Sequence, residues 1–106
     1  MTRKIIKYNL PFRAGEIQDG EVSGQIPKDA TLLKCHIQVI VTTPVLYVWA
    51  LVDTNAEKEE KRFRVHGTGY TLPDDSVAVN PDSGEFEYWD TVFGRDVIWH
   101  VFVSVS

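Results

Sequence analysis

Apolar residues recur at every second position along much of this chain, and this alternation constrains the fold more than any other feature of the sequence. In residues 32–42, apolar side chains occupy every second position from Leu33 to Val41. Alternate residues of a β-strand lie on the same face, so the pattern predicts a strand with one buried face and one solvent-exposed face. Helical periodicity is missing almost everywhere.

The same reasoning predicts further strands, each bounded by turn-forming residues. They cover residues 4–10, 21–26, 45–53, 62–66, 85–93 and 97–105. Several short strands at regular spacing are typical of all-β domains. We therefore expect an all-β fold, a single small antiparallel β-sandwich or partly open barrel of about seven to eight short strands.

Residues 45–72 are expected to form an antiparallel β-hairpin, because two apolar-alternating runs flank the polar stretch DTNAEKEEK. The run 45–53 is apolar on both faces, which predicts a central strand. The composition of AEKEEK favours helix. It has no apolar face, however, so we interpret it as the solvated tip of the hairpin.

Turn chemistry separates the predicted strands. Thr42-Thr43-Pro44 predicts a turn, because proline restricts its own backbone and that of its predecessor. The segments Leu72–Ser76 and Asn80–Gly84 also have turn composition. Gly94-Arg95-Asp96 is expected to join the last two strands as a hairpin.

Length and charge indicate one soluble domain over residues 1–106. The net charge is −4, whereas a general nucleic-acid binder is expected to be basic, so we expect no direct nucleic-acid binding. The apolar segment Ile37–Val52 is interrupted and too short to span a bilayer, and the start of the chain does not resemble a signal peptide. The single Cys35 is expected to be a buried thiol, which fits a reducing cytoplasm.

The predicted strand 62–66 carries the best candidate for a binding surface. Arg62, Arg64 and His66 are expected to line one face, with Phe63 and Val65 facing inward. The glycine turn that follows can present backbone amides to a phosphate, so the basic row and the turn together can bind a nucleotide. The candidate ligand- or partner-binding residues are Trp49, Arg62, Arg64, His66, Gly67, Thr68, Gly69 and Tyr70.

A structural interpretation of the same residues stays open. Arg62 and Arg64 can pair instead with Glu57, Glu59 or Glu60 on a solvated hairpin. The glycine turn lacks the strand-to-helix context of a phosphate-binding loop, and a bulge or strand end explains it equally well.

Catalytic and metal sites find little support in the sequence. His36, His66 and His100 lie on separate predicted strands without the spacing of a zinc site. The acidic pair Asp74 and Asp75, and the group Glu85, Glu87 and Asp90, are more typical of turns and outer strand faces than of acid–base catalysis. We expect no enzyme, no metal and no cofactor.

Two predicted strands, 45–53 and 97–105, are apolar on both faces, which is more than a domain of this size easily buries. Surplus apolar surface usually indicates a partner. It favours either a homodimer or a flat docking face for another protein.

The segments YVWALVD, RFRVHGTGYTLPDD and IWHVFV, which follow a Tyr-Asn-Leu-Pro start, together resemble a family of short uncharacterised bacteriophage and prophage proteins. The resemblance covers most of the chain. The family tends to have Val-Gln-X-Gly before its central tryptophan strand, whereas this chain has Val-Ile-Val-Thr-Thr-Pro.

The resemblance implies a protein in the cytoplasm of an infected bacterial host that acts by binding. The leading hypothesis is an inhibitor that occludes a host defence protein, such as a CRISPR complex. One alternative is a sponge that sequesters a nucleotide signalling molecule between protomers. Another is a structural or assembly role in the virion.

Overall fold

The computed structural model describes residues 2–12, 20–41, 43–69, 85–94 and 97–105. Within these ranges the regular elements are all strands, and no helix that could cross a membrane occurs. The strands are β1 (Arg3–Pro11), β2 (Gly20–Pro27), β3 (Thr31–Ile40), β4 (Thr43–Asp53), β5 (Lys58–Gly67), β6 (Phe86–Phe93) and β7 (Ile98–Ser104).

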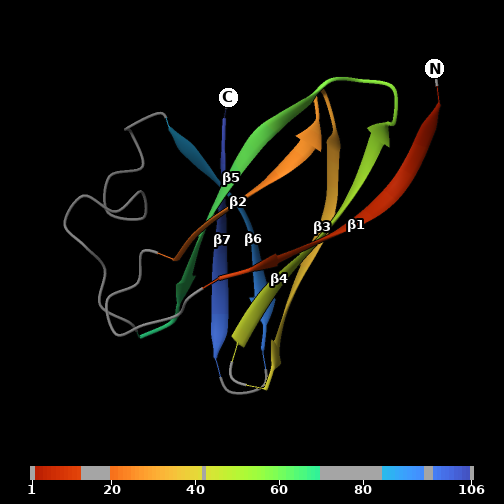
Figure 1. The fold of residues 1–106 in the computed structure, drawn as a ribbon. Helices are drawn as coiled ribbons and strands as arrows, with labels where there is room; N and C mark the ends of the chain where they lie inside the picture. Colours follow the sequence, from red (N-terminus) through yellow and green to blue (C-terminus); the bar gives the residue numbers. More distant parts are fainter. Residues whose placement is uncertain (1, 13–19, 42, 70–84, 95–96, 106) are drawn as a thin grey trace.

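The strands form two antiparallel sheets that pack face to face as a sandwich (Figure 1). The three-stranded sheet has the order β1-β4-β3, and the four-stranded sheet has the order β2-β5-β7-β6. The expected all-β fold is thus confirmed in its sandwich form, and the described strands do not close a barrel. The prediction that the strand over residues 45–53 is central is also confirmed, because β4 lies between β1 and β3.

The predicted hairpin over residues 45–72 is wrong. β4 pairs with β1 and β3, whereas β5 pairs with β2 and β7, so these consecutive strands lie in different sheets. A local turn follows β4, in which Asn55 N donates to Asp53 Oδ1 and Ala56 N donates to the Asp53 carbonyl. The chain then passes to the other sheet. Both faces of β4 are apolar, and pairing on both edges with β1 and β3 leaves no room for β5 beside it.

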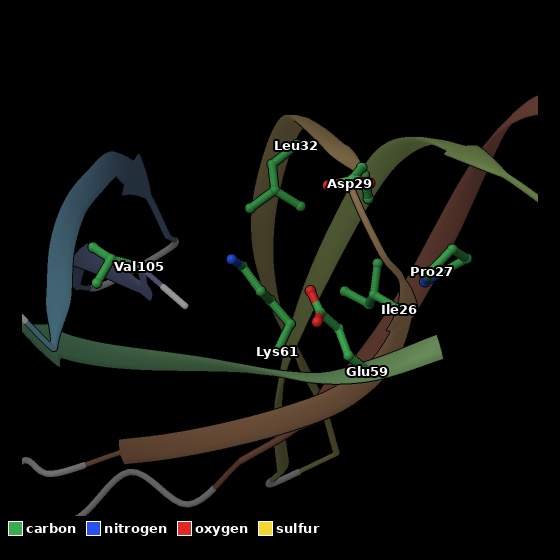
Figure 2. A pocket seen from close by; sticks show the side chains of 8 residues that line it. Ile26, Pro27, Asp29, Leu32, Glu59, Lys61 and Val105 are labelled. Carbon is green, nitrogen blue, oxygen red and sulfur yellow. The ribbon is translucent and has the colours of Figure 1, made fainter. Parts of the chain in front are cut away.

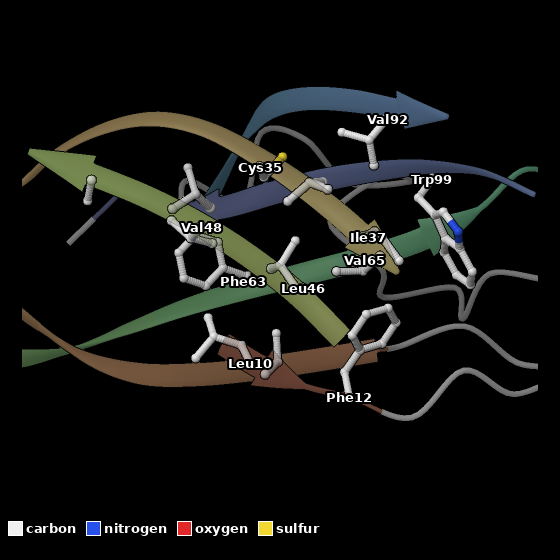
Figure 3. Packing of buried hydrophobic residues seen from close by; sticks show 14 of the residues in the cluster. Leu10, Phe12, Cys35, Ile37, Leu46, Val48, Phe63, Val65, Val92 and Trp99 are labelled. Carbon is white, nitrogen blue, oxygen red and sulfur yellow. The ribbon is translucent and has the colours of Figure 1, made fainter. Parts of the chain in front are cut away.

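The inner faces of the two sheets form one hydrophobic core (Figure 3). Two aromatic contacts contribute to it. The Phe12 and Trp99 rings meet edge to face with centroids 5.7 Å apart, and the Phe63 and Trp89 rings lie 6.0 Å apart. The predicted inward orientation of Phe63 and Val65 is confirmed, because both side chains are fully buried.

The sheets approach closely between β1 and β2. A Cβ atom at Gly24 of β2 would lie 2.7 Å from Cδ2 of Leu10 on β1, so the missing side chain makes room for the leucine. A glycine at this strand position therefore serves packing between the sheets.

Two β-bulges interrupt the alternation that the sequence displays. The register of β3 shifts between Leu32 and Lys34, so that Leu33 is the extra residue. Leu33 is consequently exposed, and Leu32 packs against the core instead. The prediction that Leu33 shares the buried face with Cys35 is wrong for this reason. A second bulge, at Trp89, shifts the register of β6 between Tyr88 and Asp90.

The turn between β3 and β4 is tighter than predicted. Thr43 and Pro44 already belong to β4, where they pair with Ile40 and Val39, so the predicted turn over Thr42-Thr43-Pro44 is wrong for these two residues. Proline is tolerated at the start of a strand, where its missing N–H breaks no ladder bond. Val41 lies in the turn with a φ of 59°, outside the buried face to which the alternation assigned it.

Candidate functional site

The predicted basic row lies on the outer face of the four-stranded sheet. Phe63 and Val65 point into the core, so Arg62, Arg64 and His66 point away from it. The shared face of these three residues follows from the strand alternation as expected. Their exposure differs, because the Arg62 side chain is 36% exposed and that of Arg64 is 17% exposed, whereas His66 is buried.

Glu21 of β2 neutralises much of the charge of this row. Arg62 Nη1 lies 3.5 Å from Glu21 Oε1, and Arg64 Nη2 lies 3.4 Å from Glu21 Oε2. Both guanidinium groups also lie over the ring of Phe86, with Cζ 5.1 and 4.9 Å from the ring centroid. The structural interpretation was correct that the arginines pair with an acid. It was wrong about the partner, because the described ion pairs of both arginines are with Glu21 and not with Glu57, Glu59 or Glu60.

His66 and His100 lie directly opposite each other on β5 and β7, on the same outer face. Thr68 Oγ1 is 2.7 Å from Nε2 of His100, and Thr91 Oγ1 is 3.2 Å from its Nδ1. A neutral imidazole has one donor and one acceptor nitrogen, so one hydroxyl donates to the ring and the other accepts from it. Tyr88 extends this chain, because its hydroxyl lies 2.5 Å from Thr91 Oγ1.

This outer face therefore combines hydroxyls, imidazoles and aromatic rings. The ring of Phe102 lies between two neighbours, with centroids 5.7 Å from those of both His66 and Tyr88. The cluster can donate and accept hydrogen bonds and offers ring edges to a ligand. In nucleophilic catalysis a carboxylate usually orients the imidazole, and here the hydroxyl of Thr91 occupies that position.

The glycine turn after β5 is only partly available to a ligand. Gly67 is the last residue of β5 and pairs with Trp99. Thr68 N donates to the carbonyl of Ile98 at 2.8 Å, so the sheet already uses this amide. Gly69 has a φ of 86° and open space where a Cβ would lie. Tyr70 lies outside the described residues.

Trp49 does not join the basic row. Its neighbours Val48 and Ala50 are fully buried, so Trp49 points outward from the three-stranded sheet, on the opposite side of the sandwich. There it packs beside Tyr47, with ring centroids 6.5 Å apart. The ammonium of Lys7 lies 4.2 Å from the Tyr47 centroid and 5.8 Å from that of Trp49.

The other titratable candidates are dispersed. His36 pairs with Tyr47 in the three-stranded sheet, whereas His66 and His100 lie in the four-stranded sheet. Within the described ranges, no three His, Cys, Asp or Glu side chains converge as metal ligands. Asp74 and Asp75 lie outside the described residues, as do the segments Leu72–Ser76 and Asn80–Gly84.

Cys35 is buried, as expected, with 1% of its surface exposed. Burial is the main cause that raises the pKa of its thiol to about 12, and the nearby Asp90 carboxylate adds to the effect. A thiol with such a pKa stays protonated at neutral pH, so Cys35 lacks the thiolate needed of a nucleophile.

One surface was missed by the sequence reasoning. Five exposed apolar residues gather at the end of the sandwich where the β3–β4 and β6–β7 hairpins turn: Val39, Ile40, Val41, Phe93 and Ile98. We call this surface the hairpin-tip patch. The absence of any charged residue from position 37 to position 52 was the signal in the sequence that could have indicated it.

Contacts between the hairpins place both turns at the same end. Trp99, near the start of β7, packs on Phe12, and Phe12 N donates to the carbonyl of Pro44 at the start of β4. Figure 3 accordingly shows Ile37, Val92, Trp99 and Phe12 together at one end of the core. Both hairpins also turn at the lower end of Figure 1.

The family comparison matches the whole chain. The family described as Domain of unknown function (DUF7352) matches residues 1–106. The chain belongs to this family. A search of the curated proteins and of the solved structures found no significant match. Membership in DUF7352 names no activity, ligand or partner, and the resemblance to phage and prophage proteins stays a prediction.

Proposed function

We propose that this chain is a non-enzymatic binding protein that inhibits a partner protein by covering part of its surface, and that the hairpin-tip patch makes the contact. The observation that carries the proposal is Val41, which has a φ of 59° and is 93% exposed. This left-handed conformation costs an ordinary residue roughly 1–2 kcal/mol. Because the Val41 side chain is almost fully exposed, packing within the protein does not compensate this cost. Strained residues of this kind concentrate at functional surfaces.

The chemistry of the patch favours an apolar partner surface. Exposed apolar patches of about a few hundred Å² commonly mark protein interaction sites. Phe93 is 75% exposed and offers an aromatic anchor at the same end of the sandwich as the exposed aliphatic side chain of Val41. Two neighbouring hairpin turns form a projecting end, which fits an apolar groove. In a homodimer formed through this patch, two projecting ends would have to meet. We therefore propose a different protein as the partner that contacts the patch.

The resemblance to phage and prophage proteins supports a more specific partner. We assign the partner to the host defence proteins of an infected bacterium, with the chain acting in the host cytoplasm. Inhibition by occlusion needs a rigid contact surface and no catalytic group. The described strands that end beside these turns belong to the two sheets, which position Val39, Ile40, Phe93 and Ile98 for such a contact.

The test compares the wild type with Val41→Asp and Phe93→Asp, and with Ile5→Asp as the matched control. Ile5 is 65% exposed on β1, away from the patch. Aspartate tolerates the left-handed region better than valine, so Val41→Asp is expected to fold. Co-purification from host lysate identifies a partner, and titration with the purified partner then measures affinity.

We expect the two patch variants to bind that partner at least about thirtyfold more weakly, as for a hot spot of ~2 kcal/mol. Ile5→Asp should bind like the wild type, and the patch variants should lose protection of a phage on a host that carries the defence system. Equal affinity of all four proteins would refute the proposal. A dimer that Val41→Asp alone dissociates would reassign the patch to self-association.

The nucleotide sponge is the second candidate, and it is favoured by the opposed His66 and His100 and by the two threonine hydroxyls that contact His100. The pairing of Arg62 and Arg64 with Glu21 weighs against it, because a phosphate would have to compete with that carboxylate. Replacing both arginines by alanine should abolish nucleotide binding in a folded protein. Unchanged nucleotide binding would remove this candidate.

A further inference from the structure

A small hollow of about 240 Å³ opens between the sheets at the end opposite the hairpin-tip patch (Figure 2). Ile26 and Pro27 at the end of β2, and Leu32 near the start of β3, form part of its wall. The full lining is Ile26, Pro27, Asp29, Ala30, Leu32, Glu59, Lys61 and Val105. Pockets for drug-sized molecules start at about 300 Å³, so this hollow suits a smaller ligand.

Two charged residues of β5 occupy positions that the alternation assigns to the core. Glu59 and Lys61 precede Phe63 on the same strand face, and Phe63 is fully buried. Figure 2 shows both side chains directed into the hollow. Charged side chains at these inward positions leave the hollow open, whereas apolar side chains at the same positions would fill it.

Within the part of the chain that the structure describes, the charged side chains that line the hollow form no ion pair. Among the described residues, no ion pair or side-chain hydrogen bond involves Asp29, Glu59 or Lys61, and Glu59 and Lys61 are both half-buried. Two residues next to the lining, Lys28 and Glu57, do interact with each other. Lys28 N donates to the carbonyl of Glu57 at 2.9 Å, and their side chains lie 3.3 Å apart.

We propose that this hollow binds a small aliphatic α-amino acid in its zwitterionic form. Lys61 pairs with the ligand carboxylate, and Glu59 pairs with its ammonium group with support from Asp29. The aliphatic side chain lies on Ile26 and Leu32. One cation and two carboxylates disfavour a simple anion, and charge-assisted hydrogen bonds to both ends of a zwitterion satisfy all three groups. The hollow is distinct from the hairpin-tip patch, so this inference is independent of the proposed function.

The first experiment titrates the ¹⁵N-labelled wild-type protein with L-leucine, N-acetyl-leucine and leucinamide, and follows backbone amide shifts. N-acetyl-leucine lacks the ammonium group and leucinamide lacks the carboxylate. Leucine should shift the amides of the lining residues with a Kd of about 1 mM or tighter. Each analogue should bind about tenfold more weakly, the loss expected for one charge-assisted contact.

Matched variants on the same strand test the residues. Lys61→Met and Glu59→Gln should each weaken leucine binding about tenfold. Lys58→Met and Glu60→Gln change the same residue types on the opposite strand face and should leave it unchanged. A wild-type protein without saturable shifts would overturn the proposal, as would equal binding of leucine and leucinamide. The analogue series needs no variant, so a misfolded mutant does not affect it.

Discussion

Lys34 Nζ lies 2.7 Å from Asp90 Oδ2, and this ion pair joins an edge strand of each sheet directly after a β-bulge. The bulges place Leu33 and Trp89 as extra residues, and the next residue of each strand then faces its counterpart across the sandwich. The hydrogen bond from Lys34 is the main cause that lowers the pKa of Asp90, and the backbone N–H of Thr91 contributes. Bulges also protect edge strands from pairing with other chains.

We predict that Lys34→Met raises the pKa of Asp90 toward its ordinary value. A carboxyl with a lowered pKa in the folded state adds stability above its unfolded pKa, and this contribution disappears as the pH falls through the folded pKa. The variant should therefore lose less stability on acidification than the wild type. Carboxyl ¹³C titration by NMR measures the pKa, and urea unfolding at several acidic pH values measures the stability.

Lys28→Met is the control for this prediction, because its partner Glu57 is 81% exposed. Its acid dependence should match that of the wild type, since exposed pairs contribute little. An unchanged Asp90 pKa in Lys34→Met would contradict the assignment of the pKa shift to the ion pair.

Val41→Gly is expected to stabilise the protein. Glycine adopts a φ of 59° without the steric cost that valine bears there. That relief of roughly 1–2 kcal/mol exceeds the entropic cost of glycine, which leaves a gain of about 1 kcal/mol. Urea unfolding measures it, with Val39→Gly as the control that should lose stability. A less stable Val41→Gly would show that the valine is not strained.

Gly94→Ala is expected to destabilise the last hairpin. A Cβ at this position would lie 2.7 Å from the carbonyl oxygen of Val97 and 2.9 Å from Nε1 of Trp99. Backbone cannot yield as a side chain can, so the cost should be about 1–3 kcal/mol. Gly24→Ala meets only the flexible end of Leu10 and should cost less. The prediction fails if urea unfolding ranks the two variants in the opposite order.

The thiol of Cys35 should be inert in the native protein. Burial leaves it 1% exposed and raises its pKa to about 12, so the reactive thiolate is scarce at pH 8. A chromogenic disulfide reagent should modify it only after unfolding in urea. Complete modification within seconds under native conditions would be inconsistent with the buried position.

The sequence by itself determined the strands and most of their faces. The period-two alternation predicted β5 with the correct inward residues, Phe63 and Val65, because side-chain direction along a strand depends only on local backbone geometry. It also placed Arg62, Arg64 and His66 on one face. The bulge at Leu33 made the predicted faces of β3 wrong at that residue, since an extra residue shifts the faces without a local signature in the sequence.

Only the tertiary structure decided which strands pair and what each exposed side chain meets. The polar stretch after β4 connects two sheets, because a turn sequence does not specify whether the next strand returns beside the last one or crosses over. Glu21 meets Arg62 and Arg64, and His100 meets Thr68, through pairings between strands distant in the sequence. The hairpin-tip patch likewise exists because core packing brings two separate turns to one end.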